Sequence, residues 1–126
     1  MDESEIIQLT IKKSATIIES MKQLDETARG ILFVVDDNNK LSGSLTDGDI
    51  RRWILKTGDL TAEVSIVMNK NPKAAIEGDA ESAQRMMKKY GVLSLPVLNA
   101  DGSIKDILFE VNRGDWKRCC DKKNKL

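Results

Sequence analysis

The pattern of apolar and polar positions predicts alternating short helices and strands in the first half of the chain. After Thr16, apolar residues recur at three- and four-residue spacing, which predicts an amphipathic helix packed on a core. Residues 31–35 are all apolar and predict a buried strand, and residues 41–45, which follow a polar turn, predict its hairpin partner. A second helix is expected between Thr46 and Gly58.

The second half of the chain repeats this plan at a constant spacing. Leu32 aligns with Leu95 and Leu45 with Leu108, each pair lying 63 residues apart. The two helix caps, Thr16 and Asp79, obey the same offset. Further strand-like segments are expected at residues 6–11, 64–68 and 73–76. The pattern therefore predicts an α+β fold made of a duplicated β-α-β-β-α unit.

The two copies differ where the second hairpin strand runs into a helix. In the first copy, the Thr46 hydroxyl can cap the helix and Asp49 stands at its third position, the arrangement of a capping box. Such a helix start offers backbone N–H donors to an anion, and a carboxylate there can accept the hydroxyls of a sugar. The second copy has Phe109 and Asn112 at these positions, so the fold does not need the two polar side chains. A ribose-phosphate site and a simple helix cap both stay open.

Composition narrows the classes of function. The 126 residues suffice for one core, and 20 Lys+Arg balance 20 Asp+Glu, which argues against a nucleic-acid partner. No apolar run approaches the roughly 20 residues of a membrane span, and the acidic N-terminus does not resemble a secretory signal. Histidine is absent, and the two cysteines, Cys119 and Cys120, are adjacent. We therefore expect a cytoplasmic protein without a metal site, a disulfide framework or catalytic residues.

Over residues 6–112 the chain resembles a tandem pair of CBS (cystathionine-beta-synthase-type) domains. Gly43, Thr46, Asp49 and Ile50 fit the family motif in the first copy. The resemblance implies CBS repeats at 6–60 and 61–118 with a tail at 119–126, packed sheet to sheet about a pseudo-twofold axis. It also implies a regulatory module that binds an adenosine nucleotide (AMP, ADP or ATP), requires no cofactor and forms a homodimer through its helices. The alternative is a ligand-free dimerisation or scaffold module.

A narrower resemblance concerns the enzyme that such a module would regulate. Residues 46–52 and 67–72 are similar to the CBS pair that precedes a sugar-phosphate nucleotidyltransferase domain, as in mannose-1-phosphate guanylyltransferase-like proteins. The glycine-rich catalytic signature of those enzymes is absent from this sequence. The chain is therefore expected to be the regulatory part of such an enzyme or a stand-alone relative.

The family resemblance also implies which residues form the ligand site. Thr46 would lie near the phosphate and Asp49 would accept the ribose hydroxyls. The other site residues it implies come from the motif and from the facing repeat: Gly43, Ser44, Val67, Pro72, Lys73 and Val92. A second cleft would present Phe109 and Asn112, so we expect one competent site.

Overall fold

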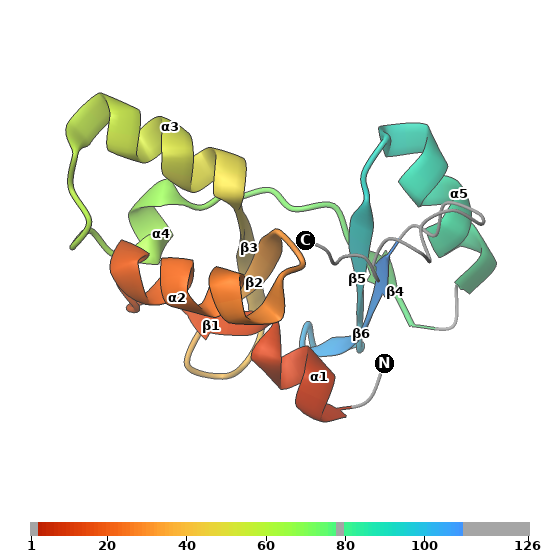
Figure 1. Cartoon of the computed structure of the whole chain (residues 1–126). Coiled ribbons are helices and arrows are strands. Elements are labelled where there is room, and N and C mark those ends of the chain that lie inside the picture. The colour runs from red at the N-terminus through yellow and green to blue at the C-terminus, as the bar shows by residue number, and fades with distance from the viewer. Residues whose placement is uncertain (1–2, 78–79, 110–126) are drawn as a thin grey trace.

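The protein contains two three-stranded sheets, each covered by helices (Figure 1). The computed structural model describes residues 3–77 and 80–109. In chain order the elements are α1 (Glu3–Gln8), β1 (Thr10–Lys12), α2 (Ile17–Thr27), β2 (Ile31–Val35), β3 (Leu41–Thr46), α3 (Asp47–Thr57), α4 (Val64–Val67), β4 (Ala75–Ile76), α5 (Ala80–Tyr90), β5 (Ser94–Leu98) and β6 (Ile104–Phe109). In each sheet the first two strands are parallel and the last two antiparallel.

The duplication predicted from the sequence is confirmed in the backbone. Helices α2 and α5, strands β2 and β5, and strands β3 and β6 have bounds related by the same 63-residue offset. The hairpin register repeats too, with Leu32 opposite Leu45 in one sheet and Leu95 opposite Leu108 in the other. Both hairpins also carry an irregularity at the equivalent point, after Val34 and after Val97. The two halves therefore share one folding plan to the level of strand register.

Two segments expected to be strands are helical. Residues 6–11 contain the end of α1 and most of β1, with Ile6 and Leu9 buried at a spacing of three. Residues 64–67 form α4, which buries Val64 on the core beneath the first sheet. Short runs of β-branched residues favour strands by composition, but burial of positions three apart favours a helical turn. The strand prediction was wrong for residues 6–8 and for 64–67.

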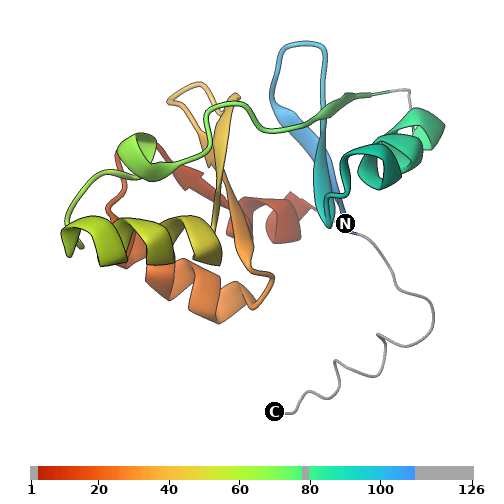
Figure 2. The same ribbon diagram turned by 90° about the horizontal axis from the view of Figure 1, so that it is seen from above.

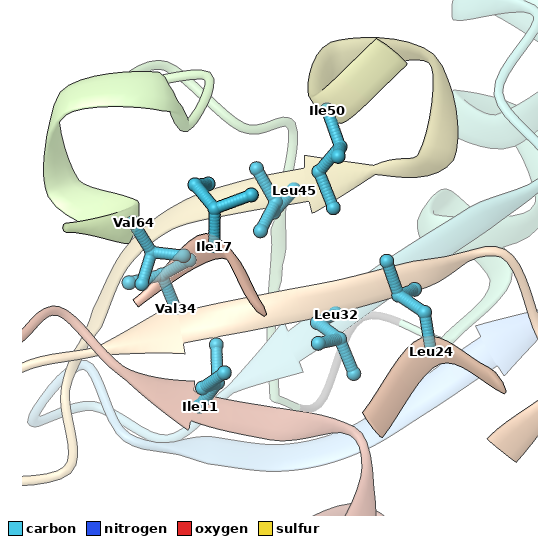
Figure 3. Packing of buried hydrophobic residues seen from close by; sticks show 8 residues of the cluster. All are labelled: Ile11, Ile17, Leu24, Leu32, Val34, Leu45, Ile50 and Val64. Atoms are coloured by element: carbon cyan, nitrogen blue, oxygen red, sulfur yellow. The ribbon is translucent and has the colours of Figure 1, made fainter. Parts of the chain in front are cut away.

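The largest apolar cluster lies between the first sheet and the helices that cover it. Leu32, Val34 and Leu45 project from β2 and β3 toward Ile17 and Leu24 of α2 (Figure 3). Several members of the cluster are completely buried. Burying a Leu, Ile or Val side chain contributes about 1.5–3 kcal/mol, so this cluster holds α2 against the sheet and fixes where β3 ends.

The other faces of the two sheets pack against each other. Phe33 of β2 and Ile107 of β6 form a shared cluster with Ile6 and Leu9. At one end of this interface the hairpin turns meet, where Lys40 forms a bridge with Ser103, its own counterpart in the other copy. A contact between equivalent residues of the two copies is expected at the axis that relates the copies. The predicted sheet-to-sheet packing about a pseudo-twofold axis is therefore confirmed.

The segment after α4 carries the chain from the first sheet to the second (Figure 2). On the way it pairs with the edge of β3, where the Ser44 N–H donates to the Asn69 carbonyl at 3.0 Å and the Asn69 N–H donates back at 2.8 Å. Gly43 permits this approach, since a Cβ there would lie 2.6 Å from the Met68 sulfur and 2.7 Å from the Asn69 carbonyl oxygen. The crossing segment therefore forms a wall beside the end of β3.

Candidate functional site

A cavity of about 350 Å³ lies between the two sheets, beside the crossing segment. Most of its lining residues form pairs related by the 63-residue offset: Arg29 and Val92, Gly30 and Leu93, Ile31 and Ser94, Phe33 and Pro96, Thr46 and Phe109. The remaining lining residues come from β3 and the crossing segment: Ser44, Asn69, Pro72 and Lys73. Equivalent residues of both copies therefore line the cavity, and β3 and the crossing segment add further lining residues from the first copy's side only.

Thr46 reaches this cavity from the end of β3. Its hydroxyl accepts a hydrogen bond from the Asp49 N–H at 3.2 Å and caps α3 as the sequence predicts. The hydroxyl proton has no acceptor among the residues the structure describes. A threonine hydroxyl can donate and accept at once, so Thr46 can cap the helix and still donate a hydrogen bond to a ligand.

Asp49 completes the capping box and does not line the cavity. Its Oδ2 accepts the Thr46 N–H at 3.0 Å, and its Oδ1 accepts a bond from Arg52 at 2.8 Å. The Arg52 side chain is largely exposed, so this ion pair contributes little to stability. Each carboxylate oxygen has a second lone pair, so Asp49 keeps the capacity to accept a further hydrogen bond.

Ser44 places a second hydroxyl at the cavity. Only 8% of the residue is exposed, and its hydroxyl has no hydrogen-bond partner among the described residues. Leaving a buried hydroxyl unsatisfied costs about 1–3 kcal/mol, a cost that a polar ligand would remove. An orphaned buried hydroxyl facing a cavity is therefore an observation that points to a bound polar group.

Gly43 and Val67 lie outside the cavity. Gly43 is a buried residue of β3, and its lack of a side chain admits Met68 and Asn69. Val67 is the last residue of α4 and packs against the core of the first sheet. Of the residues implied by the family resemblance, the structure therefore gathers five at the cavity: Ser44, Thr46, Pro72, Lys73 and Val92.

Arg29 is a cavity residue that the sequence reasoning missed. It follows α2, and its guanidinium carbon lies 4.4 Å from the centre of the Phe109 ring. Lys73 makes a similar contact, with its ammonium 4.6 Å from the centre of the Tyr90 ring. The 63-residue offset makes Arg29 the equivalent of Val92, which the family resemblance implies, and this equivalence was a signal for its place at the cavity but not for its contact with Phe109.

The pseudo-symmetric counterpart of the cavity is filled by side chains. Ile6 and Leu9, from the segment that precedes β1, pack there against Phe33, Ile107 and Phe109. Where the first copy offers hydroxyls at Ser44 and Thr46, the second offers Ile107 and Phe109. The side chains of this cluster are all apolar, in contrast to the hydroxyls of Ser44 and Thr46. Asn112, Asp79 and the tail at 119–126 lie outside the described residues.

Two other features, a metal-binding cluster and a membrane-spanning helix, are absent from the described residues. Residues 3–77 and 80–109 contain no cluster of three or more metal-ligating side chains. None of the helices in this part is both long and apolar enough to span a bilayer.

Comparison with known sequences connects this geometry to a family. Residues 4–56 match the CBS domain. Arabinose 5-phosphate isomerase GutQ from Salmonella typhi is 29% identical over 92 residues, which cover 72% of this chain and 29% of GutQ. An L-aspartate semialdehyde sulfurtransferase from Methanosarcina acetivorans is 29% identical over 105 residues, covering 82% of this chain and 21% of that protein. The chain thus spans less than a third of the length of these curated relatives.

Solved structures show the same fold. Staphylococcus aureus OpuCA superposes with a TM-score of 0.70 at 22% identity, covering 81% of this chain and 84% of that one. A CBS domain protein from Pyrobaculum aerophilum complexed with AMP gives a TM-score of 0.70 at 19% identity, with coverage of 80% and 79%. The CBS domain pair of protein MJ0100, in complex with 5′-methylthioadenosine and S-adenosyl-L-methionine, gives 0.68 at 25% identity, with coverage of 80% of each chain. The chain therefore has the fold of a CBS domain pair, and its residues 4–56 carry the sequence match to the CBS domain family.

Proposed function

We propose that the protein is a regulatory module that binds one adenosine nucleotide in the cavity between its sheets. The observation that carries the proposal is the pair of hydroxyls at the cavity, one on Thr46 at a helix start and one on Ser44 that is buried without a partner. The AMP-bound protein from Pyrobaculum aerophilum and the MJ0100 pair support an adenosine ligand, because both share this fold. No cofactor is required by this function.

The apolar and polar parts of the cavity wall would each face a matching part of a nucleotide. Ile31, Val92 and Pro96 offer apolar walls for an adenine ring. Thr46 would bind the phosphate group beside the start of α3, where backbone N–H groups favour an anion. Asp49 would accept the ribose hydroxyls from the rim. The filled second cleft supports a single site for each chain.

Regulation would follow from the position of the cavity between the two copies. A ligand there touches β3 and the crossing segment on one side and the start of β5 on the other. It therefore stabilises the arrangement of the two sheets that fits it better, and the equilibrium shifts by its difference in affinity for the two arrangements. In this proposal the chain transmits ligand occupancy and does not itself catalyse a reaction.

The regulated enzyme would act on a sugar phosphate. The similarity to GutQ, which is named as an arabinose 5-phosphate isomerase, supports this class of enzyme. The match covers only 29% of the length of GutQ. A sugar-phosphate nucleotidyltransferase, suggested by residues 46–52 and 67–72, belongs to the same broad class and stays our second candidate. Copurification of the protein with enzymes that convert sugar phosphates tests both.

We further propose that the protein forms a homodimer through the helices of its first copy. A groove between α2 and α3 is lined by apolar side chains, including Met21 and Ile54, and Leu55 at its edge is 80% exposed. Met87 on α5 is only 4% exposed and belongs to the core, so it is not available for this contact. Replacing Leu55→Glu should leave the fold intact and shift sedimentation from dimer to monomer. A monomeric wild-type protein at high concentration would contradict the proposal.

The nucleotide proposal is tested by thermal titration with AMP, ADP, ATP and S-adenosylmethionine. A ligand at 100 times its dissociation constant should raise stability by about 2.7 kcal/mol. Asp49→Ala should abolish this response, whereas Glu19→Ala, which breaks the equivalent capping box on α2 away from the cavity, should not. If no ligand stabilises the protein, or if both variants respond like the wild type, the ligand-free scaffold function is favoured instead.

A further inference from the structure

Two cations and no carboxylate line the cavity. Arg29 and Lys73 are the charged residues of its lining, and every other lining side chain is uncharged. Asp47 approaches Gly30, but it lines the groove between α2 and α3 rather than this cavity. The space therefore carries a net positive charge, although the whole chain is neutral.

Both cations are held by aromatic faces rather than by acids. The Arg29 guanidinium lies over Phe109 at 4.4 Å, and the Lys73 ammonium lies over Tyr90 at 4.6 Å. Neither forms an ion pair among residues 3–77 and 80–109. A guanidinium stacked on a ring keeps its N–H donors free at its edge, and an aromatic face orients a cation without neutralising it. The positive charge is thus positioned but not compensated.

Arg29 lies at the same end of the cavity as the hydroxyl of Thr46. It precedes Gly30 and Ile31, and Ile31 stands directly opposite Thr46 in the β2–β3 register. The Gly30 carbonyl also accepts a bond from the first N–H of α3, that of Asp47, at 3.4 Å. The backbone at Arg29 therefore lies beside the start of α3, and the Arg29 and Thr46 side chains line the same cavity, where the proposed function places the ligand's phosphate.

Building on that proposed function, we infer that Arg29 and Lys73 make the cavity selective for phosphate-bearing adenosine ligands over S-adenosylmethionine and 5′-methylthioadenosine. AMP carries close to two negative charges at neutral pH, 5′-methylthioadenosine carries none, and S-adenosylmethionine has a net positive charge. A phosphate between the two cations gains charge-assisted hydrogen bonds, whereas a sulfonium in the same place is repelled. Arg29, which the Thr46 motif does not include, is the main determinant of this selectivity.

The test compares three ligands on the full chain by calorimetry: AMP, 5′-methylthioadenosine and S-adenosylmethionine. AMP should bind about tenfold to a hundredfold more tightly than 5′-methylthioadenosine, as expected for losing charged hydrogen bonds. Arg29→Gln should remove most of that advantage, lower AMP affinity about tenfold and leave 5′-methylthioadenosine affinity unchanged. Arg29→Lys should retain much of it, and Lys73→Gln should have a smaller effect in the same direction.

Arg51→Gln is the matched control, because Arg51 is a cation on α3 that lines the other groove. It should change none of the affinities. Equal affinity for AMP and 5′-methylthioadenosine in the wild type would overturn the selectivity and leave the nucleotide site standing. An equal loss of both ligands in Arg29→Gln, with an unchanged melting temperature, would likewise overturn it. Failure of all three ligands to bind would overturn the proposed function itself.

Discussion

Replacing Gly43 by alanine should displace the crossing segment from the edge of β3. The new Cβ would lie 2.6 Å from the Met68 sulfur and 2.7 Å from the Asn69 carbonyl oxygen. Both distances are too short for carbon contacts, and the second atom belongs to the backbone, so the segment itself must move. That movement breaks the reciprocal backbone hydrogen bonds between Ser44 and Asn69, at 3.0 and 2.8 Å.

The magnitude follows from those two bonds. Each contributes about 0.5–1.5 kcal/mol, so their loss costs about 1–3 kcal/mol. Alanine restricts the unfolded chain and offsets about 0.4–1 kcal/mol of this. The free energy of unfolding of Gly43→Ala should therefore fall. Nucleotide affinity should fall with it, because Asn69 and Pro72 on the displaced segment line the cavity.

Urea unfolding and AMP calorimetry measure the two effects. Gly48→Ala is the control, because its Cβ would approach only the end of the flexible Arg52 side chain closely, at 3.3 Å, and would lie in ordinary contact with the Thr46 hydroxyl oxygen at 3.7 Å. Alanine is favoured over glycine within a helix by about 1 kcal/mol, so this control should match or exceed the wild-type stability. A Gly43→Ala protein with wild-type stability and wild-type affinity would refute the assigned role of the glycine.

Three further predictions concern stability. Leu45→Ala, at a fully buried position, should lower the free energy of unfolding by about 2–5 kcal/mol in urea titrations; a loss within error would contradict the assigned core. Hydrogen bonds from the Lys40 and Asn38 N–H groups lower the pKa of Asp36, so the ionised form stabilises the fold, and this contribution should disappear as pH falls below the ordinary value of 3.8. The Ser103 hydroxyl and N–H lower the pKa of Asp101 in the same way, so Asp101→Asn should flatten the acid limb of stability against pH, and an unchanged slope would exclude this cause.

The duplication could be read from the sequence because it depends on local patterns. Apolar residues at helical spacing and short apolar strand segments recur in both copies, and the 63-residue offset between them also relates the registers of the two hairpins. The segments around Ile6 and Val64 were misassigned because each is only a few residues long. Their helical form is decided by what they pack against, and that information is not local.

In the candidate site, too, features that depend on local spacing could be predicted from the sequence, and features that depend on long-range contacts could not. The capping box of Thr46 and Asp49 follows from spacing alone and is present as predicted. The role of Arg29 could not be predicted from the sequence, because it depends on contact with Phe109. The fold brings this residue, which is distant in sequence, beneath the Arg29 guanidinium. The sequence also could not show that Ile6 and Leu9 fill the second cleft, since this depends on how α1 docks against β6.

The stoichiometry of AMP binding is the strongest test of a single nucleotide site at the Thr46 end of the cavity. Calorimetry on the full chain should give one AMP per chain, and Thr46→Val should abolish binding. Thr16→Val removes the equivalent helix cap on α2, at a similar cost of about 1 kcal/mol, and should bind like the wild type. Two AMP per chain, no AMP at all, or equal binding by the two variants would contradict a single site that depends on Thr46.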